Sequence, residues 1–160
     1  MTMSVEMSQE MNPQPPLRMT AELKDLAAIR CFVQETATAL KADPDVISDV
    51  ILAANEAVTN VIIHGYQGQP GPVEVEVERD GASLVVRVRD QAPPFDPNDV
   101  PAPDLTLPLE RRACGGMGVY MIRRLVDQVI HLVTPQGGNE LTLIKKQSIL
   151  LKEETNEHSD

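Results

Sequence analysis

Cysteine is scarce in this chain of 160 residues, which contains only Cys31 and Cys114. Two cysteines are too few for a disulfide framework, and their wide separation lacks the short spacing of zinc ligands. Residues 1–19 also lack the cationic start and apolar block of a signal peptide. These absences argue against a disulfide-rich secreted protein, so we expect a cytoplasmic one.

Long apolar runs and an excess of positive charge are missing as well. No run approaches the roughly 20 apolar residues that a membrane-spanning helix needs, so we expect no membrane span. The 14 Lys and Arg residues are outnumbered by 24 Asp and Glu residues, which gives a formal net charge of -10. Because phosphate backbones demand clustered Lys and Arg, we expect no direct nucleic-acid partner. The length itself predicts a single domain.

The most informative segment is 45–64, where a helical pattern carries polar residues on one edge. Glu56, Asn60 and His64 are four residues apart, so at about 100° per residue they line that edge. The opposite side is an apolar packing stripe made by Ile47, Val50, Ile51, Ala54, Val58, Val61 and Ile62. A carboxylate one turn before an amide suits phosphoryl transfer, because it offers a proton acceptor and an oxygen ligand for Mg²⁺. Taken alone, a solvated helix face explains these residues equally simply.

Two later segments favour a site. The strand pattern at 86–90 stops at Asp90, whose carboxylate is thereby placed to face a pocket. Further on, three glycines within 115–118 open a second helical pattern. Glycines let backbone N–H groups approach an anion closely, and a helix N-terminus favours negative charge. The second segment therefore predicts a phosphate site without a lysine.

Three helices are expected from apolar periodicity. The first covers about residues 20–40. The second has Asp43 as a plausible N-cap and Pro44 at its first position, and it ends at Gly65. The third covers 119–127 and follows the glycines.

Two strand pairs are expected. Residues 73–78 alternate valine and glutamate, so the valines face a core and the glutamates face water. Asp80-Gly81 then predicts a hairpin into a strand at 84–90. A second pair is expected at 128–134 and 140–146. Helices followed by hairpins predict an α+β fold, a two-layer sandwich with helices on one face of a mixed β-sheet.

In this order the segments resemble the ATP-binding domain shared by gyrases, Hsp90 chaperones, histidine kinases and mismatch-repair proteins, which has the Bergerat-type fold. Glu56 and Asn60 match its N box, Asp90 to Pro97 its first glycine box, and Gly115 to Gly118 its second. The stretches 115–127 and 138–146 are particularly similar to the anti-sigma-factor serine kinase branch. Any one box is a weak signal, whereas three in order are a strong one.

The resemblance covers about residues 20–147, which we expect to form the kinase domain. Residues 1–19 are expected to be a flexible segment and 148–160 a charged tail. Six prolines interrupt 91–114, where the family has a nucleotide lid. The family also begins with a strand, for which only Leu17-Arg18-Met19 is available.

The resemblance implies roles for single residues. Glu56 matches the general base that accepts a proton from the attacking hydroxyl, and Asn60 matches a ligand of Mg²⁺ and the nucleotide. Asp90 matches the acceptor for the adenine amino group. The plain alternatives are a surface glutamate, a capping amide and a turn-forming aspartate.

Further nucleotide contacts are expected from the same match. His64 is placed to approach phosphate, although a histidine at a helix C-terminus often serves only as a cap. Arg111 is placed to reach the γ-phosphate. Thr142 matches a strand threonine near adenine, and plain β-propensity explains it almost as well. Ala92 departs from the family's glycine and narrows backbone freedom beside the base. The phosphate loop is completed by Gly115, Gly116, Met117, Gly118 and Val119.

The resemblance implies an ATP-dependent serine or threonine kinase with ATP or ADP and Mg²⁺ as cofactors. Its partners would be a sigma factor, which it silences, and an anti-anti-sigma antagonist, which it phosphorylates; a homodimer is left open. One alternative is a module that binds ATP and sequesters a partner without phosphorylating it. Another is the detached catalytic domain of a histidine kinase.

Overall fold

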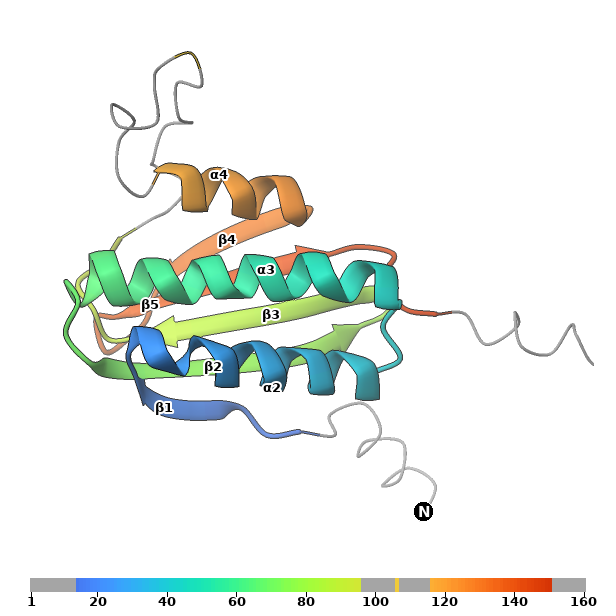
Figure 1. The fold of residues 1–160 in the computed structure, drawn as a ribbon, viewed down its shortest axis with the longest axis horizontal. Helices are drawn as coiled ribbons and strands as arrows, with labels where there is room; N and C mark the ends of the chain where they lie inside the picture. The colour runs from blue at the N-terminus through green and yellow to red at the C-terminus, as the bar shows by residue number, and fades with distance from the viewer. Residues whose placement is uncertain (1–13, 96–105, 107–115, 151–160) are drawn as a thin grey trace, which may run out of the picture.

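The computed structural model of the protein describes residues 14–95, Thr106 and residues 116–150. They form one five-stranded sheet with helices laid across one of its faces (Figure 1). The strand order is β1-β2-β3-β5-β4, and every pair is antiparallel. The strands are β1 (Leu17–Ala21), β2 (Gly71–Asp80), β3 (Ser83–Asp90), β4 (Gln128–Val133) and β5 (Asn139–Lys145).

The helical layer consists of η1 (Leu23–Asp25), α2 (Leu26–Ala39), α3 (Pro44–Asn60), η2 (Val61–Gly65) and α4 (Gly116–Leu125). In Figure 1, α3 lies between α2 and α4. The predicted start of α3 is confirmed, because the Asp43 side chain accepts a hydrogen bond from the Asp45 N–H and Pro44 follows at the first helical position. The helix then changes to the π-type turn η2, in which the Tyr66 N–H donates to the Val61 carbonyl at 2.8 Å.

The core lies between the helices and the sheet, and strand alternation explains its composition. Val73, Val75 and Val77 of β2 are almost fully buried beneath the helices. They pack with the apolar stripes of α2, α3 and η2, including Ile29, Val33, Ile47, Val50, Ala54, Val58 and Ile62. The valines of the alternating strand and most of the apolar stripe predicted within 45–64 are therefore buried, as the sequence patterns predicted.

The opposite face of the sheet carries ion pairs. Arg89 donates to Glu76 at 3.1 Å and to Glu140 at 2.7 Å, and it also pairs with Glu74. Burial alone would raise the pKa of Glu74, but hydrogen bonds from Arg18 and Arg89 outweigh it and lower that pKa. The glutamates of the alternating strand thus face away from the core, as predicted.

Two fold predictions need correction. The α+β class with helices on one face is confirmed, but the sheet is antiparallel throughout the described strands and not mixed. The first α-helix begins at Leu26 and not near Thr20, because Thr20 and Ala21 pair with Pro72 and Gly71 in the sheet. Strand β1, for which the sequence offered only Leu17 to Met19, therefore has five residues.

The packed part of the chain extends beyond both predicted domain limits. Leu17 to Met19 belong to β1, although the flexible segment was predicted to reach residue 19. At the other end Ser148 is fully buried, and Ile149 forms a β-bridge with Ala42. The Ser148 carbonyl accepts a hydrogen bond from the Asp43 N–H at 2.7 Å, so the predicted tail is anchored at its start.

One helical run, Pro44–Gly65, is long and apolar enough to cross a membrane by length and composition alone, with mean hydropathy 1.6. A core helix often meets the same criterion, so this is a weak indication. Ile47, Val50, Val58 and Ile62 of this run pack in the core described above. The sequence predicted that no segment is apolar enough to span a membrane, and this run corrects that prediction as far as length and composition are concerned.

Candidate functional site

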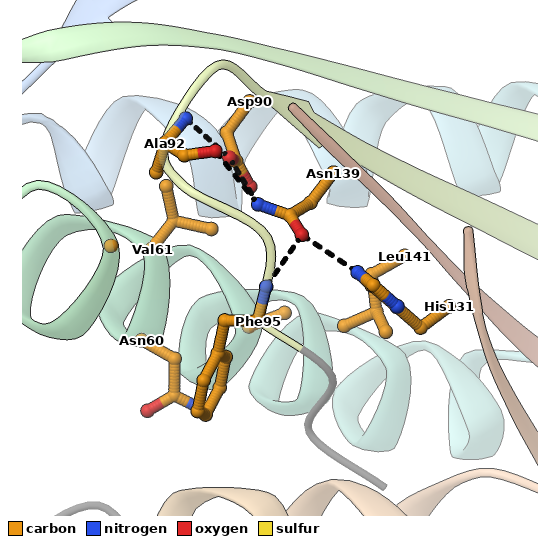
Figure 2. Close-up of a pocket in the computed structure, with 10 residues that line it drawn as sticks. Asn60, Val61, Asp90, Ala92, Phe95, His131, Asn139 and Leu141 are labelled. Carbon is orange, nitrogen blue, oxygen red and sulfur yellow. Dashed lines mark hydrogen bonds between the residues drawn. The ribbon is translucent and has the colours of Figure 1, made fainter. Parts of the chain in front are cut away.

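A pocket lies between the end of α3 and the ends of β3, β4 and β5 (Figure 2). Its inner space is about 30 Å³, which admits a water molecule. The residues around it are Ala57, Asn60, Val61, Gly65, Asp90, Ala92, Phe95, His131, Asn139 and Leu141. Of the predicted site residues, the pocket thus brings together Asn60, Asp90 and Ala92.

Asp90 occupies the last position of β3 and is only 8% exposed. It has the same strand parity as Val86 and Val88, so its side chain faces the helices. Its Oδ1 accepts hydrogen bonds from the Ala92 N–H at 2.8 Å and from Asn139 Nδ2 at 2.9 Å. Among the described residues, no hydrogen bond goes to Oδ2, which leaves that oxygen for a ligand.

Burial sets the protonation behaviour of Asp90. It raises the pKa of the carboxyl group, because the charged form loses solvation. The hydrogen bonds from Asn139 and from the Ala92 N–H act in the opposite direction, as does the nearby His131. The charged, hydrogen-bond-accepting state of Asp90 therefore depends on the groups that hold its Oδ1.

Ala92 fits beside the pocket because its neighbour is a glycine. A Cβ atom added at Gly65 would lie 2.9 Å from the Ala92 Cβ, which is too close for ordinary contact. Ala92 itself is 2% exposed. The glycine at the end of η2 thus provides the room that the methyl group of Ala92 occupies in the first glycine box.

Asn60 ends α3 and is 9% exposed. Its Nδ2 is buried and has no hydrogen-bond partner in the described part of the chain. Asn60 and Phe95 both line the pocket (Figure 2). A buried amide that the protein leaves unbonded is rare and indicates a missing partner, such as a bound ligand or water.

The other two residues of the predicted polar edge do not line the pocket. Glu56 is half-buried one turn before Asn60, and His64 is half-buried within η2. A π-type turn holds more residues per turn than an α-helix, so the fourfold spacing is lost after Asn60. Asn60 is the member of that edge which reaches the pocket.

The glycine-rich segment is described only from Gly116 onward, where α4 begins. The helix predicted at 119–127 is confirmed with other bounds, because it begins at Gly116, within the second glycine box, and ends at Leu125. The first turn of α4 consists of Gly116, Met117, Gly118 and Val119. Arg111, Gly115 and most of the predicted lid at 91–114 lie outside the described residues.

Thr142 does not line this pocket, and its predicted place near adenine stays a prediction. It pairs with Arg87 in the register of β3 and β5, on the face that carries the ion pairs. The pocket residues of β5 are Asn139 and Leu141, which have the opposite parity.

The sequence reasoning overlooked Asn139, His131 and Phe95. One signal was present: Asn139 has the parity of the buried Leu141 and Leu143, so a polar residue stands on the apolar face of its strand. Such a residue needs a partner and is a candidate for a site.

The turn after Asp90 also forms a hydrogen bond with Tyr66, the residue that follows η2. The Gln91 N–H donates to the Tyr66 hydroxyl at 2.8 Å, and this hydroxyl donates to the Pro72 carbonyl at 2.6 Å. Burial raises the pKa of Tyr66, so the hydroxyl stays protonated at neutral pH and keeps its donor role.

Comparisons with known proteins agree with this fold. The serine-protein kinases RsbW of Bacillus cereus and Bacillus anthracis are 27% identical over 121 residues, which cover 72% of this chain and 76% of each relative. The SiaB–SiaC complex of Pseudomonas aeruginosa has the same fold, with a TM-score of 0.60 at 13% identity over 89% of this chain and 95% of that one. The RsbU and RsbW domains from Mycobacterium tuberculosis give a TM-score of 0.53 at 21% identity, over 86% of this chain and 35% of that longer chain.

The family itself is shown by a profile match over most of the chain. The profile of the histidine kinase-like ATPase domain matches residues 19–145, a range that contains all three predicted boxes and all five strands except the start of β1. The resemblance stated from the sequence is confirmed by this match. The chain therefore belongs to the histidine kinase-like ATPase domain family.

Proposed function

We propose that the protein is an ATP-dependent serine or threonine protein kinase of the anti-sigma type. The observation that carries the proposal is the pair formed by Asp90 and Asn60 in one pocket. Asp90 offers a carboxylate oxygen, Oδ2, that accepts no hydrogen bond among the described residues, and Asn60 has a buried amide nitrogen with no partner among them. A purine with an exocyclic amino group is the kind of ligand that Asp90 complements.

The nucleotide would lie with its adenine at Asp90 and its phosphates toward the start of α4. Backbone N–H groups at a helix N-terminus favour phosphate, and Gly116 and Gly118 allow close approach. The oxygen of the Asn60 side chain would complete the shell of Mg²⁺, whose other ligands would be phosphates and water. When bound, this ion neutralises negative charge that develops on the transferred phosphoryl group. Arg111 and His64 remain candidates for phosphate contacts.

Glu56 would act on the substrate hydroxyl. It lies one helical turn before Asn60 and is half-buried, so solvent and a partner protein can reach it. There it would accept the proton of a serine or threonine hydroxyl as the oxygen attacks the γ-phosphorus, while the bond from that phosphorus to the β–γ bridging oxygen breaks and ADP leaves. The substrate would thus approach from outside the helical layer.

The partners are inferred from the relatives. Similarity to serine-protein kinases RsbW supports a protein substrate. We propose that the chain binds a sigma factor and phosphorylates an anti-anti-sigma antagonist in the cytoplasm. The kinase domain would comprise the predicted 20–147 together with the packed residues 17–19 and 148–150.

Transfer of labelled γ-phosphate to a candidate antagonist tests the proposal. Glu56→Gln keeps the size of the side chain but removes its charge, and loss of a general base slows transfer by roughly 10²- to 10⁴-fold. ADP binding should stay at the wild-type level. Glu35→Gln, the same change at an exposed site on α2, is the matched control. Transfer at the wild-type rate by Glu56→Gln contradicts the base role, and partner binding without transfer by the wild type indicates a sequestering module instead.

A further inference from the structure

Asn139 is the most heavily bonded side chain of the pocket. It is the first residue of β5 and only 6% exposed. Figure 2 shows it between the turn that follows Asp90 and the ring of His131. It therefore joins two strands and a turn that lie far apart in the sequence.

The hydrogen bonds determine which way the amide of Asn139 points. Its Oδ1 lies 2.9 Å from the Phe95 N–H and 2.7 Å from His131 Nε2. Its Nδ2 faces three oxygen acceptors: Asp90 Oδ1 at 2.9 Å, the Pro93 carbonyl at 3.2 Å and the Ala92 carbonyl at 3.3 Å. A flipped amide would set its nitrogen against an N–H donor and its oxygen against three acceptors. The orientation is thus unambiguous, and His131 must carry a proton on Nε2.

This orientation decides what Asp90 can do. Asn139 Nδ2 and the Ala92 N–H both donate to Asp90 Oδ1, so Oδ2 is the oxygen that remains to accept a hydrogen bond from a ligand. Burial favours the protonated acid, and the Asn139 bond is the strongest of the interactions that oppose it. A protonated acid would donate a hydrogen bond instead of accepting one. Adenine presents an amino donor at the relevant ring position, whereas guanine presents a carbonyl acceptor.

Gly138 allows this contact to form. A Cβ atom at position 138 would lie 2.0 Å from the Asp90 carbonyl oxygen and 2.8 Å from the Gln91 Cα. Both are backbone atoms, so no flexible side chain could yield. The start of β5 is therefore built to lie directly against the turn after Asp90.

We propose that Asn139, oriented by His131, is a positioning residue that keeps Asp90 a pure acceptor and thereby sets a preference for adenine over guanine nucleotides. The inference rests on the proposed function only in taking a purine nucleotide as the ligand. It assigns the specificity of the pocket to two residues outside the three boxes, on strands β4 and β5. His131 acts through Asn139 and touches no ligand in this role.

The experiment measures the dissociation constants of ADP and GDP by calorimetry on the full chain. Asn139→Leu keeps a similar volume and removes all these bonds, and we expect the ADP-over-GDP preference to fall about tenfold or more. His131→Leu keeps Asn139 but removes one donor that orients it, and we expect a fall of about three- to tenfold. His131→Gln should keep the ADP-over-GDP preference near the wild-type value, because the glutamine amide can donate to Asn139 in place of the Nε2–H of histidine. Ile130→Thr, on the same strand but on the opposite face, is the control.

Each outcome decides the proposal. A wild-type preference in Asn139→Leu overturns it, and a His131→Gln variant that matches His131→Leu overturns the orienting role of the histidine. Wild-type protein that binds no ADP overturns the proposed function and this inference together, whereas wild-type binding with unchanged variants overturns this inference alone. If thermal unfolding shows that Asn139→Leu is not folded, the His131 variants decide, since that residue lies on the edge strand.

Discussion

Replacing Asp90 by Asn should separate ligand binding from stability. The variant keeps an oxygen that can accept the bonds from Asn139 and the Ala92 N–H. It turns an amino group, in place of Oδ2, toward the pocket. The substitution thus preserves the packing while it removes both the charge and the acceptor that adenine requires.

The effect on binding follows from the lost acceptor. A hydrogen bond to a charged group contributes roughly 1.5 to 3 kcal/mol. ADP should therefore bind about 10- to 150-fold more weakly to Asp90→Asn, since each 1.4 kcal/mol is tenfold. GDP should lose less, because the new amide can donate to its carbonyl.

The effect on stability has the opposite sign. Burial raises the pKa of Asp90 above its ordinary value, so the folded protein holds the proton more tightly than the unfolded chain. The contribution of such a group is fully present below the unfolded-state pKa and is lost as pH rises through the folded-state pKa. At neutral pH the ionised carboxylate thus lowers the free energy of unfolding. Asp90→Asn should be more stable than the wild type at pH 7, and this advantage should shrink toward acid pH.

Urea unfolding at several pH values and calorimetry with ADP and GDP test both parts. Asp80→Asn makes the same change at the exposed hairpin end of β2 and should alter neither quantity. Wild-type affinity for ADP in Asp90→Asn would refute the adenine contact. Lower stability than the wild type at pH 7 would refute the argument from burial.

Three further changes probe single features. Asn60→Ala should weaken ADP binding in the presence of Mg²⁺ more than in its absence. It should lose little stability, because Nδ2 has no described partner. Calorimetry with and without the ion checks the first point, and equal losses of affinity would exclude Asn60 as a metal ligand. Gly138→Ala should lower the free energy of unfolding by roughly 1 to 3 kcal/mol or more in urea titrations, because its Cβ would overlap the Asp90 carbonyl. Thr142→Val should leave the ADP dissociation constant unchanged, since Thr142 lies on the sheet face opposite the pocket. Weaker ADP binding by this variant would support the predicted contact of Thr142 near adenine.

Local patterns in the sequence determined the elements whose signals are short-range. Asp43 and Pro44 mark the start of α3 because a cap and a first-turn proline act within a few residues. The hairpin of β2 and β3 follows from Asp80-Gly81, where Gly81 adopts a positive φ of 61°. The three boxes likewise placed Asn60 and Asp90 in one site, because their order along the chain carried the family resemblance.

Only the tertiary structure decided where these elements meet. Thr20 and Ala21 have a helical pattern, yet they pair with β2, since a gain from sheet pairing overrides a weak local preference. Asn139 lies 49 residues from Asp90 and meets it because β5 inserts between β3 and β4. Strand order and parity depend on non-local pairing, and a shift by one residue exchanges the two faces of a strand. For this reason the sequence did not identify Asn139 as a pocket residue, whereas the fold places it against Asp90.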